Sequence, residues 1–430
     1  MKRVPFCPHL VSIATTLIIV STTFAAAQRS VVLHTFGRTT GDGMSPWSAL
    51  VSDKSGNLYG TTTAGGTFNH GTVFELIKPT TGPWTEEVLY SFGANSNDGT
   101  FPQAGVIFDN KGDLYGTTFG GSIDGSNSGT VYELSPPTTS GAPWTETLLF
   151  AFPNARGNSG TPAGLVFGAH GVLYGVTTDG GNGDGSAFEL HPPAVAGGPW
   201  TEKTFFLFDI ANGQEPEYQG GSLTVDASGN LYGTAPFGGV YGSGVVYEFS
   251  PPAGGGPWTE TILYSFGSSP LDAIGPLCKV VFDSAGNLYG TSAAGGAYDY
   301  GAVWELSPPT TTGDPWTETI INSLTGSNGL NSRAGVVFDK AGNLYGTTFG
   351  GGTGNPEEGV VFELSPPAVS GDSWTETVLE NFTNGPGGGQ LYSGLLVNQQ
   401  GTIYGTTSTG GLPNCGPYSN GCGVAFELKP

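Results

Sequence analysis

Gly-Asn-Leu-Tyr-Gly-Thr-Thr occupies residues 56–62, and the Leu-Tyr-Gly within it recurs along the chain in near-identical surroundings. Six copies have Leu before the tyrosine and the last has Ile, with the tyrosines at Tyr59, Tyr115, Tyr174, Tyr232, Tyr289, Tyr345 and Tyr404. The copies are 56 to 59 residues apart. A fixed period of this length indicates a tandem-repeat architecture, in which each copy buries its apolar faces against its neighbours.

The second copy shows how one repeat is built. Residues 104–109 and 113–118 are short apolar strands joined by a tight turn at Asn110-Lys111-Gly112, which together predict a hairpin. A Gly-rich loop leads to a third strand at 130–134, and a fourth strand from Trp144 to Phe152 follows the Pro136-Pro137 turn. The chain has 74 Gly and 31 Pro in 430 residues and no helical periodicity. Seven units of four antiparallel strands predict an all-β fold, a seven-bladed β-propeller.

The two chain ends predict how the ring closes. Residues 31–36 read as a fourth strand, whereas the chain ends in a third strand at 424–428. Trp-Thr-Glu opens the fourth strand in only six repeats, at Trp84, Trp144, Trp200, Trp258, Trp316 and Trp374. We therefore expect residues 30–36 to pair beside 423–429 and complete the seventh blade, which removes the sheet edge. An open solenoid is the alternative, but it would need polar terminal caps that the sequence does not show.

These motifs resemble known families. The Gly-Val-Val-Phe-Asp strand, the Gly-Asn turn and the Leu-Tyr strand are similar to NHL and streptogramin-lyase-like propeller repeats. The longer series of Gly-Asn-Leu-Tyr-Gly-Thr-Thr, Gly-Gly, Val-Phe-Glu-Leu and Pro-Trp-Thr-Glu resembles the bacterial Gloeo/Verruco (GloVer) tandem-repeat family over residues 31–430. That resemblance implies an exported propeller without an established activity. Members often carry a C-terminal surface anchor; this chain stops at Pro430 after its last strand, so we expect no membrane anchor.

The first 27 residues differ in kind from the repeats. Lys2 and Arg3 precede an apolar run, and Ala25-Ala26-Ala27 offers a cleavage site, which predicts a secretory signal peptide at 1–27 and a single domain at 28–430. A retained membrane anchor is the alternative, although the run is short and interrupted by Ser and Thr. We expect a secreted or periplasmic monomer. The whole chain has a net charge of −22, and the mature part would carry 35 acidic residues against 11 basic ones, which argues against nucleic acid as a partner.

Three cysteines follow the signal segment. Cys415 and Cys422 flank a short Gly/Pro/Asn loop, and in an exported protein a disulfide between them is expected. Cys278 lies in an apolar run and is expected to be a buried thiol.

The glutamates that recur in the third strand of every repeat are interpreted as structural residues. No cofactor is predicted, and Ca²⁺ is the ion that a ring of third-strand carboxylates would attract. Those carboxylates are Glu75, Glu133, Glu189, Glu248, Glu305, Glu363 and Glu427. Because they recur in every repeat, they are interpreted first as hydrogen-bonded structural groups.

A site that acts once per molecule should lie where the repeats diverge, in the loops before the first strand and between the second and third strands. In an up-and-down blade both loop sets emerge on one face, the variable-loop face. Acids, arginines and exposed rings there suit a sugar or a protein surface. The candidate ligand-binding residues on this face are Arg38, His70, Asp98, Asp124, Arg156, Asp179, Asp184, Tyr241, Tyr298, Asp299, Tyr300 and Arg333.

No catalytic residue is predicted. The sequence has no Ser-containing nucleophile elbow, no His-rich metal spacing and no phosphate-binding Gly loop outside the repeated turns. The resemblance to lyase-like propellers implies a catalytic histidine, and no position here carries that role over. We therefore favour a non-catalytic binding or scaffold propeller for a glycan or protein partner. A carboxylate-based glycoside hydrolase or lyase on the variable-loop face is the alternative, and a metal-stabilised structural protein is a further one.

Overall fold

The structure is a computed structural model of the 430-residue chain. It describes residues 30–95, 98–121, 127–139, 141–153, 161–180, 183–195, 197–216, 222–252, 254, 256–311, 313–353, 358–369, 371–415 and 420–429. The expected signal peptide at 1–27 and the candidate residues Asp124 and Arg156 lie outside these ranges. Within them, no helix has the length and apolarity that crossing a membrane requires.

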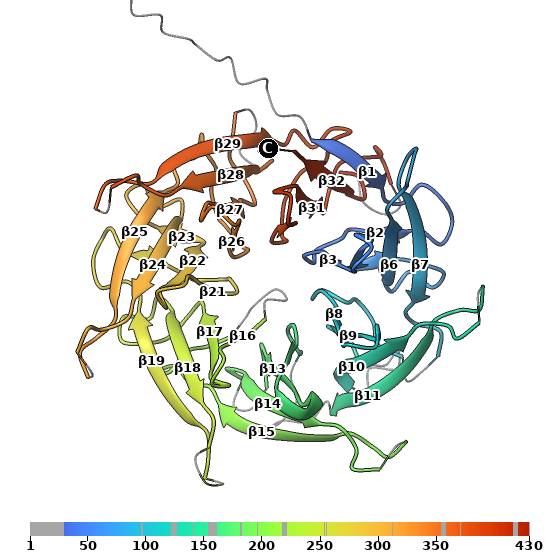
Figure 1. Ribbon diagram of the computed structural model, residues 1–430, viewed down its shortest axis with the longest axis horizontal. Coiled ribbons are helices and arrows are strands. Elements are labelled where there is room, and N and C mark those ends of the chain that lie inside the picture. Colours follow the sequence, from blue (N-terminus) through green and yellow to red (C-terminus); the bar gives the residue numbers. More distant parts are fainter. Residues whose placement is uncertain are drawn as a thin grey trace, which may run out of the picture.

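Seven four-stranded antiparallel sheets are arranged as the blades of a propeller around a central axis (Figure 1). The fold prediction is therefore confirmed. Counted from the axis outward, blade 1 consists of β3 (Val51–Ser52), β4 (Leu58–Thr62), β6 (Thr72–Ile77) and β7 (Thr85–Ser91). Blade 2 consists of β8 (Ile107–Phe108), β9 (Leu114–Thr118), β10 (Asn127–Ser135) and β11 (Thr145–Pro153). Blade 3 consists of β12 (Val166–Phe167), β13 (Leu173–Thr177), β14 (Ser186–His191) and β15 (Thr201–Leu207).

The next three blades repeat this plan. Blade 4 consists of β16 (Thr224–Val225), β17 (Leu231–Ala235), β18 (Val245–Ser250) and β19 (Thr259–Ser265). Blade 5 consists of β21 (Val281–Phe282), β22 (Leu288–Ser292), β24 (Ala302–Ser307) and β25 (Thr317–Ser323). Blade 6 consists of β26 (Val337–Phe338), β27 (Leu344–Thr347), β28 (Val360–Ser365) and β29 (Thr375–Asn381). Two extra ladders pair β2 (Gly43–Met44) with β5 (Ala64–Gly65) and β20 (Ala273–Ile274) with β23 (Ala294–Gly295), and a 3₁₀ turn, η1, spans Ala169–Gly171.

The seventh blade joins the two chain ends. It consists of β30 (Leu396–Val397), β31 (Ile403–Thr407), β32 (Val424–Leu428) and, as its outer strand, β1 (Val31–Thr35). β1 pairs antiparallel with β32, and Figure 1 shows the two strands side by side. The predicted one-plus-three closure is confirmed.

The core is divided among the seams between blades. The buried residues form seven hydrophobic clusters, each containing residues of two adjacent blades. All five residues of β4 are buried, because both faces of the sheet are covered by neighbouring blades. A single blade would expose both faces, so the repeat is stable only in an array.

The repeat signature is explained by contacts within and between blades. The glycine of Leu-Tyr-Gly leaves room for a third-strand ring: a Cβ on Gly60 would lie 2.8 Å from the Phe74 ring. The tyrosine packs on the tryptophan of the next blade, as Tyr404 does on Trp84 at 6.1 Å between ring centroids. The threonine that follows donates across the seam; the hydroxyl of Thr61 reaches the carbonyl of Ala104 at 3.0 Å. The motif therefore holds neighbouring blades together.

Candidate binding site at the mouth of the central channel

A cavity of about 340 Å³ lies on the propeller axis. Its walls come from the residues just before the innermost strand of all seven blades. Two positions in each blade matter most: the residue two places before the innermost strand and the residue four places before it. Since these segments precede the strand, they lie on the variable-loop side, at the mouth of the channel.

The position two places before the strand is small in six blades. It is occupied there by Ala49, Gly105, Gly164, Ser222, Gly335 and Gly394, and these small residues leave the axis open. Blade 5 carries Lys279 instead, an exposed side chain that lines the cavity. The repeats therefore lose their symmetry at this point.

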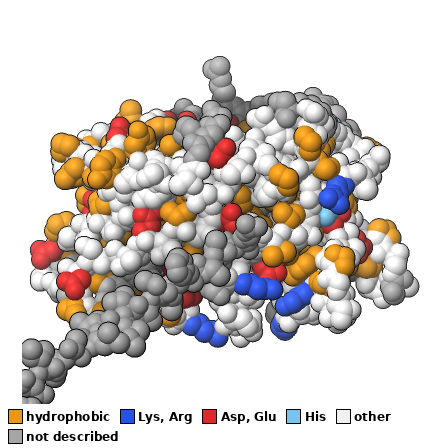
Figure 2. Space-filling view, turned by 90° about the horizontal axis from the view of Figure 1, so that it is seen from above, with side chains coloured by type: hydrophobic (Ala, Val, Ile, Leu, Met, Phe, Trp, Pro, Cys, Tyr) orange, Lys and Arg blue, Asp and Glu red, His pale blue; other side chains and the backbone are white. Residues whose placement is uncertain are grey.

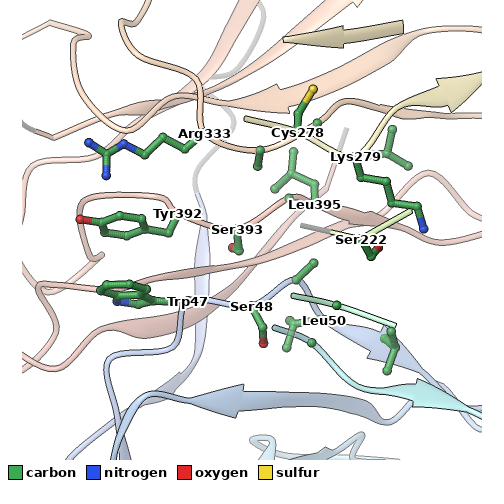
Figure 3. A pocket seen from close by; sticks show the side chains of 18 of the residues that line it. Trp47, Ser48, Leu50, Ser222, Cys278, Lys279, Arg333, Tyr392, Ser393 and Leu395 are labelled. Carbon is green, nitrogen blue, oxygen red and sulfur yellow. The ribbon is translucent and has the colours of Figure 1, made fainter. Parts of the chain in front are cut away.

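The position four places before the strand carries large side chains in three adjacent blades. These are Trp47 in blade 1, Arg333 in blade 6 and Tyr392 in blade 7. The rings of Trp47 and Tyr392 are stacked, with centroids 4.5 Å apart and an angle of 11° between their planes. Figure 3 shows Arg333, Tyr392 and Trp47 one above another on one side of the cavity, with Lys279 on the other side.

Cation–π contacts hold Arg333 in this stack. Its Cζ atom lies 4.0 Å from the centroid of the Phe349 ring and 5.1 Å from that of Tyr392. Its Nε atom donates to Oδ1 of Asn331 at 3.2 Å. We call Trp47, Arg333, Phe349 and Tyr392 the channel-mouth stack. Such contacts orient a guanidinium, and the planar N–H groups of a guanidinium are suited to carboxylate, sulfate or hydroxyl oxygens.

Of this stack, only Arg333 was predicted from the sequence. Trp47, Phe349, Tyr392 and Lys279 were not predicted, because no motif marks them and they come from blades that are distant in sequence. In an alignment of the seven copies, Trp47 and Tyr392 are larger than their counterparts in blades 2 to 5, and Lys279 is larger than its counterparts in the other blades. Phe349, in contrast, has an identical counterpart, Phe119, in blade 2.

The other described candidate residues lie around the loops and not in this cavity. Arg38, Asp179, Tyr241, Tyr298, Asp299 and Tyr300 are exposed, whereas His70 and Asp184 are half-buried. Several are engaged locally: Asp179 accepts from the amide of Thr161 at 2.6 Å, and Asp299 from that of Gly295 at 3.0 Å. The structure therefore does not bring these residues into one site, and their role in binding stays a prediction.

Asp98 is buried in the seam between blades 1 and 2. Its Oδ2 atom accepts from the amides of Gly93 and Ala94 at 2.8 and 2.9 Å and from the Tyr90 hydroxyl at 3.1 Å. By accepting these hydrogen bonds, the buried carboxylate stabilises the conformation of the loop. It is not exposed on the variable-loop face, contrary to the sequence-based expectation.

Buried carboxyl groups recur at this kind of seam. Burial and the nearby Asp98 raise the pKa of Glu146 to about 7. Burial and the hydrogen-bonded neighbour Asp272 raise the pKa of Glu318 to about 8. These glutamates are the third residues of the Trp-Thr-Glu motifs, which the sequence analysis interpreted as framework. Close like charges in a poorly solvated seam account for the shifts.

The repeated third-strand glutamates have partners inside the protein. Tyr59 donates to Glu75 at 2.8 Å, and Lys203 lies 2.6 Å from Glu189. Ser135 donates to Glu133 at 3.2 Å, an arrangement that recurs in blades 4, 5 and 6. These contacts agree with the structural interpretation of the repeated carboxylates.

A second, larger depression of about 910 Å³ lies between blades 2 and 3. Its lining includes the framework residues Tyr115, Glu133 and Trp200 and, from the η1 turn, His170. The tyrosine and the glutamate recur in every repeat and the tryptophan in five others, so the lining of this depression sets blades 2 and 3 apart from the other blades less than the channel mouth does. Figure 2, which views the disc from its side, shows acidic side chains spread over the rim and not gathered in one patch.

The fold and its repeats define the class: a seven-bladed tandem-repeat β-propeller with a cavity on its axis. A family model described as the Gloeobacter/Verrucomicrobia repeat matches residues 18–182 and 276–430. The chain therefore belongs to this repeat family, as its motifs predicted. A search of curated proteins found no match.

Solved structures share the propeller fold at low sequence identity. An ulvan lyase of polysaccharide lyase family PL25, bound to -[GlcA(1-4)Rha3S]-, has a TM-score of 0.51 at 12% identity, over 89% of this chain and 90% of the lyase. The polysaccharide lyase Uly1 has a TM-score of 0.48 at 11% identity, over 90% and 91% of the two chains. A luciferin-regenerating enzyme has a TM-score of 0.43 at 13% identity, over 76% and 91%. At these identities the likeness shows the fold alone.

Proposed function

We propose that this protein is an exported, non-catalytic propeller that binds a glycan at the mouth of its central channel. The observation that carries the proposal is the channel-mouth stack, in which two rings and a guanidinium from three blades are held together beside an open cavity.

The composition of the stack favours a sugar ligand. Aromatic rings offer flat apolar surfaces to the C–H faces of a pyranose, and an arginine beside them can hydrogen-bond its hydroxyl or carboxyl oxygens. Ser48, Ser222 and Ser393 add hydroxyl groups to the cavity wall. The walls are otherwise small or apolar, as in most small-molecule sites.

The size and shape of the cavity favour a glycan over a protein surface. A volume of about 340 Å³ lies at the lower end of the range for small-ligand sites. A protein partner would instead be expected to cover a broad, shallow area of the loops.

Binding without turnover is favoured by the cavity lining. Its described residues include neither Asp nor Glu, so they do not supply the carboxylate pair that glycoside hydrolysis requires. The ulvan lyase shares this fold and was solved with a sulfated, uronate-containing saccharide. Charged polysaccharides therefore belong in the first panel of ligands, and eliminative cleavage is the alternative that the same panel would detect.

The experiment is a binding screen of the secreted protein against neutral, uronate-containing and sulfated polysaccharides, followed by calorimetry on the best ligand. Loss of a cation–π or stacking contact is worth about 1–1.5 kcal/mol, so Arg333→Ala and Tyr392→Ala should each weaken binding about tenfold. Arg38→Ala and Tyr298→Ala are matched controls, because these exposed residues lie outside the cavity.

The controls should bind like the unmodified protein. Full binding by both channel-mouth variants would remove this site from the proposal. An unsaturated or shortened product in the screen would contradict the non-catalytic assignment.

A further inference from the structure

One group of side chains at the closure seam between blades 7 and 1 has the composition of a metal site. His34 lies on the closing strand β1, Asp42 lies in the loop that leads into blade 1, and Glu86 lies on β7. Each offers one ligand atom, and all three atoms lie within 4.8 Å of one another. The closest pair is Nε2 of His34 and Oδ1 of Asp42, at 3.3 Å.

The group is held in place by the surrounding fold. The side chain of Asp42 is 2% exposed and that of His34 is 17% exposed. The second oxygen of Asp42, Oδ2, accepts from the amide of Arg38 at 2.9 Å, which leaves Oδ1 directed at the imidazole. The His34 ring packs edge-on against Phe36, with centroids 4.8 Å apart. Two of the three ligands are thus oriented without a metal ion.

Equivalent seams show what is special about this one. Tyr90 and Tyr264 occupy the register position of His34: they pair with Val73 and Val246 as His34 pairs with Ala425. Each tyrosine hydroxyl donates to the aspartate of the next blade, at 3.1 Å for Tyr90 and Asp98 and 3.3 Å for Tyr264 and Asp272. Glu146 and Glu318 are the counterparts of Glu86 there.

At the closure seam, imidazole replaces the phenol. A neutral tyrosine hydroxyl is a hydrogen-bond donor to the aspartate, whereas a neutral imidazole offers a good metal-ligating nitrogen. At this register position the other six blades have Tyr90, Phe150, Phe206, Tyr264, Asn322 and Glu380, so an imidazole occurs here only at the seam that holds the N-terminal strand.

A second observation concerns the hydrogen bonding of Glu86. Its Oε1 atom is buried, and no hydrogen-bond partner for it is found among the described residues; the same holds for Oε1 of its counterparts Glu260 and Glu376, which have no histidine at the equivalent strand position. A buried carboxylate oxygen without a partner is costly. The nearby Glu87 adds a further carboxyl group on the same strand. A divalent cation would satisfy the oxygen and neutralise the carboxylates.

We propose that His34, Asp42 and Glu86 bind one divalent transition-metal ion that fastens the closing strand to blade 1. One imidazole nitrogen and two carboxylate oxygens suit Zn²⁺ or Mn²⁺, whereas Ca²⁺ and Mg²⁺ prefer oxygen ligands alone. The ion bridges β1 and β7, which are separated by about fifty residues in the chain, so its role is structural.

The test uses the full secreted protein without a polyhistidine tag. After treatment with a chelator and removal of the chelator, Zn²⁺ titration by calorimetry should give one site per chain, and Zn²⁺ should raise Tm. His34→Tyr is the informative variant, because it installs the side chain found between blades 1 and 2 and between blades 4 and 5, and it should preserve the fold. It should weaken Zn²⁺ binding by about a hundredfold or more and abolish the rise in Tm.

His170→Tyr is the matched control, since His170 is exposed in a turn far from the closure strand in sequence; it should bind Zn²⁺ like the unmodified protein. Tyr90→His places the same three kinds of side chain, His, Asp and Glu, at the seam between blades 1 and 2, and should therefore add a second metal site. The proposal is overturned if the unmodified protein binds neither Zn²⁺ nor Mn²⁺ and neither ion raises its Tm. It is equally overturned if His34→Tyr, folded by circular dichroism, binds the metal as tightly as the unmodified protein.

Discussion

The carboxyl groups of Asp272 and Glu318 meet at the hydroxyl of Tyr264, which lies 3.3 Å from Oδ2 of Asp272 and 3.4 Å from Oε2 of Glu318. Both acids belong to blade 5 and the tyrosine to blade 4, so the contact forms part of the seam. Two carboxylates this close and this poorly solvated are not both ionised at neutral pH without a cost.

The first prediction is that the protein loses stability as the pH rises. Burial and Asp272 raise the pKa of Glu318 from 4.5 to about 8, and burial and Asp42 raise that of Glu86 to about 7. A raised folded-state pKa means that the stabilisation is complete below the ordinary pKa and is lost as pH passes the folded pKa. Tm, measured in metal-free buffer, should therefore fall between about pH 5 and about pH 9.

Glu318→Gln should reduce that fall, because an amide carries no charge at either pH. Asp314→Asn, which alters an exposed acid of the same blade, should leave the fall unchanged. An equal Tm at both pH values, or a Glu318→Gln protein that loses as much as the unmodified one, would refute this account of the seam.

The second prediction concerns ring closure. Removal of residues 28–36 deletes β1, exposes the edge of β32 and opens the cluster containing Leu33 and Phe36. The shortened protein should aggregate or lose most of its cooperative melting transition. A chain that begins at Ser30 retains the strand and is the control. Equal melting temperatures for the two chains would show that β1 is dispensable.

The third prediction concerns the disulfide between Cys415 and Cys422, which the structure contains as the sequence predicted. The disulfide lies in the hydrophobic cluster between blades 7 and 1. A Cβ on Gly37 would come within 2.1 Å of Cys415 Sγ. Replacing both cysteines with serine should lower the free energy of unfolding by about 2–3 kcal/mol. Denaturant titration measures this value.

Cys278 is a buried thiol outside the disulfide, as predicted. It therefore provides an internal control for the disulfide: mass spectrometry after native alkylation without reductant should find all three cysteines unlabelled. Labelling of Cys415 or Cys422 under these conditions would contradict the prediction.

Much of the fold could be predicted because its determinants are local and repeated. Leu-Tyr-Gly-Thr specifies a buried strand whose glycine accommodates a neighbouring ring, and seven copies fix the number of blades. The hairpin turn is local as well, since Asp53 accepts from the amides of Ser55 and Asn57, each at 2.8 Å.

The candidate site was harder to predict because its residues are distant in sequence. Trp47 and Tyr392 are 345 positions apart and touch only because the ring closes. Charge and exposure singled out loop residues such as Tyr298, which the structure places outside the cavity. Asp98 looked like a surface acid because its burial depends on the fit of two blades, which no local pattern records.

The most direct test of the proposed function is a measurement of where a ligand lies. Hydroxyl-radical footprinting of the protein, with and without the best polysaccharide from the screen, reports the solvent exposure of individual side chains. Our account predicts protection of Trp47 and Tyr392 at the channel mouth and no change at Tyr241, Tyr298 or Tyr300. Protection confined to those three outer tyrosines, with Trp47 and Tyr392 unchanged, would contradict it.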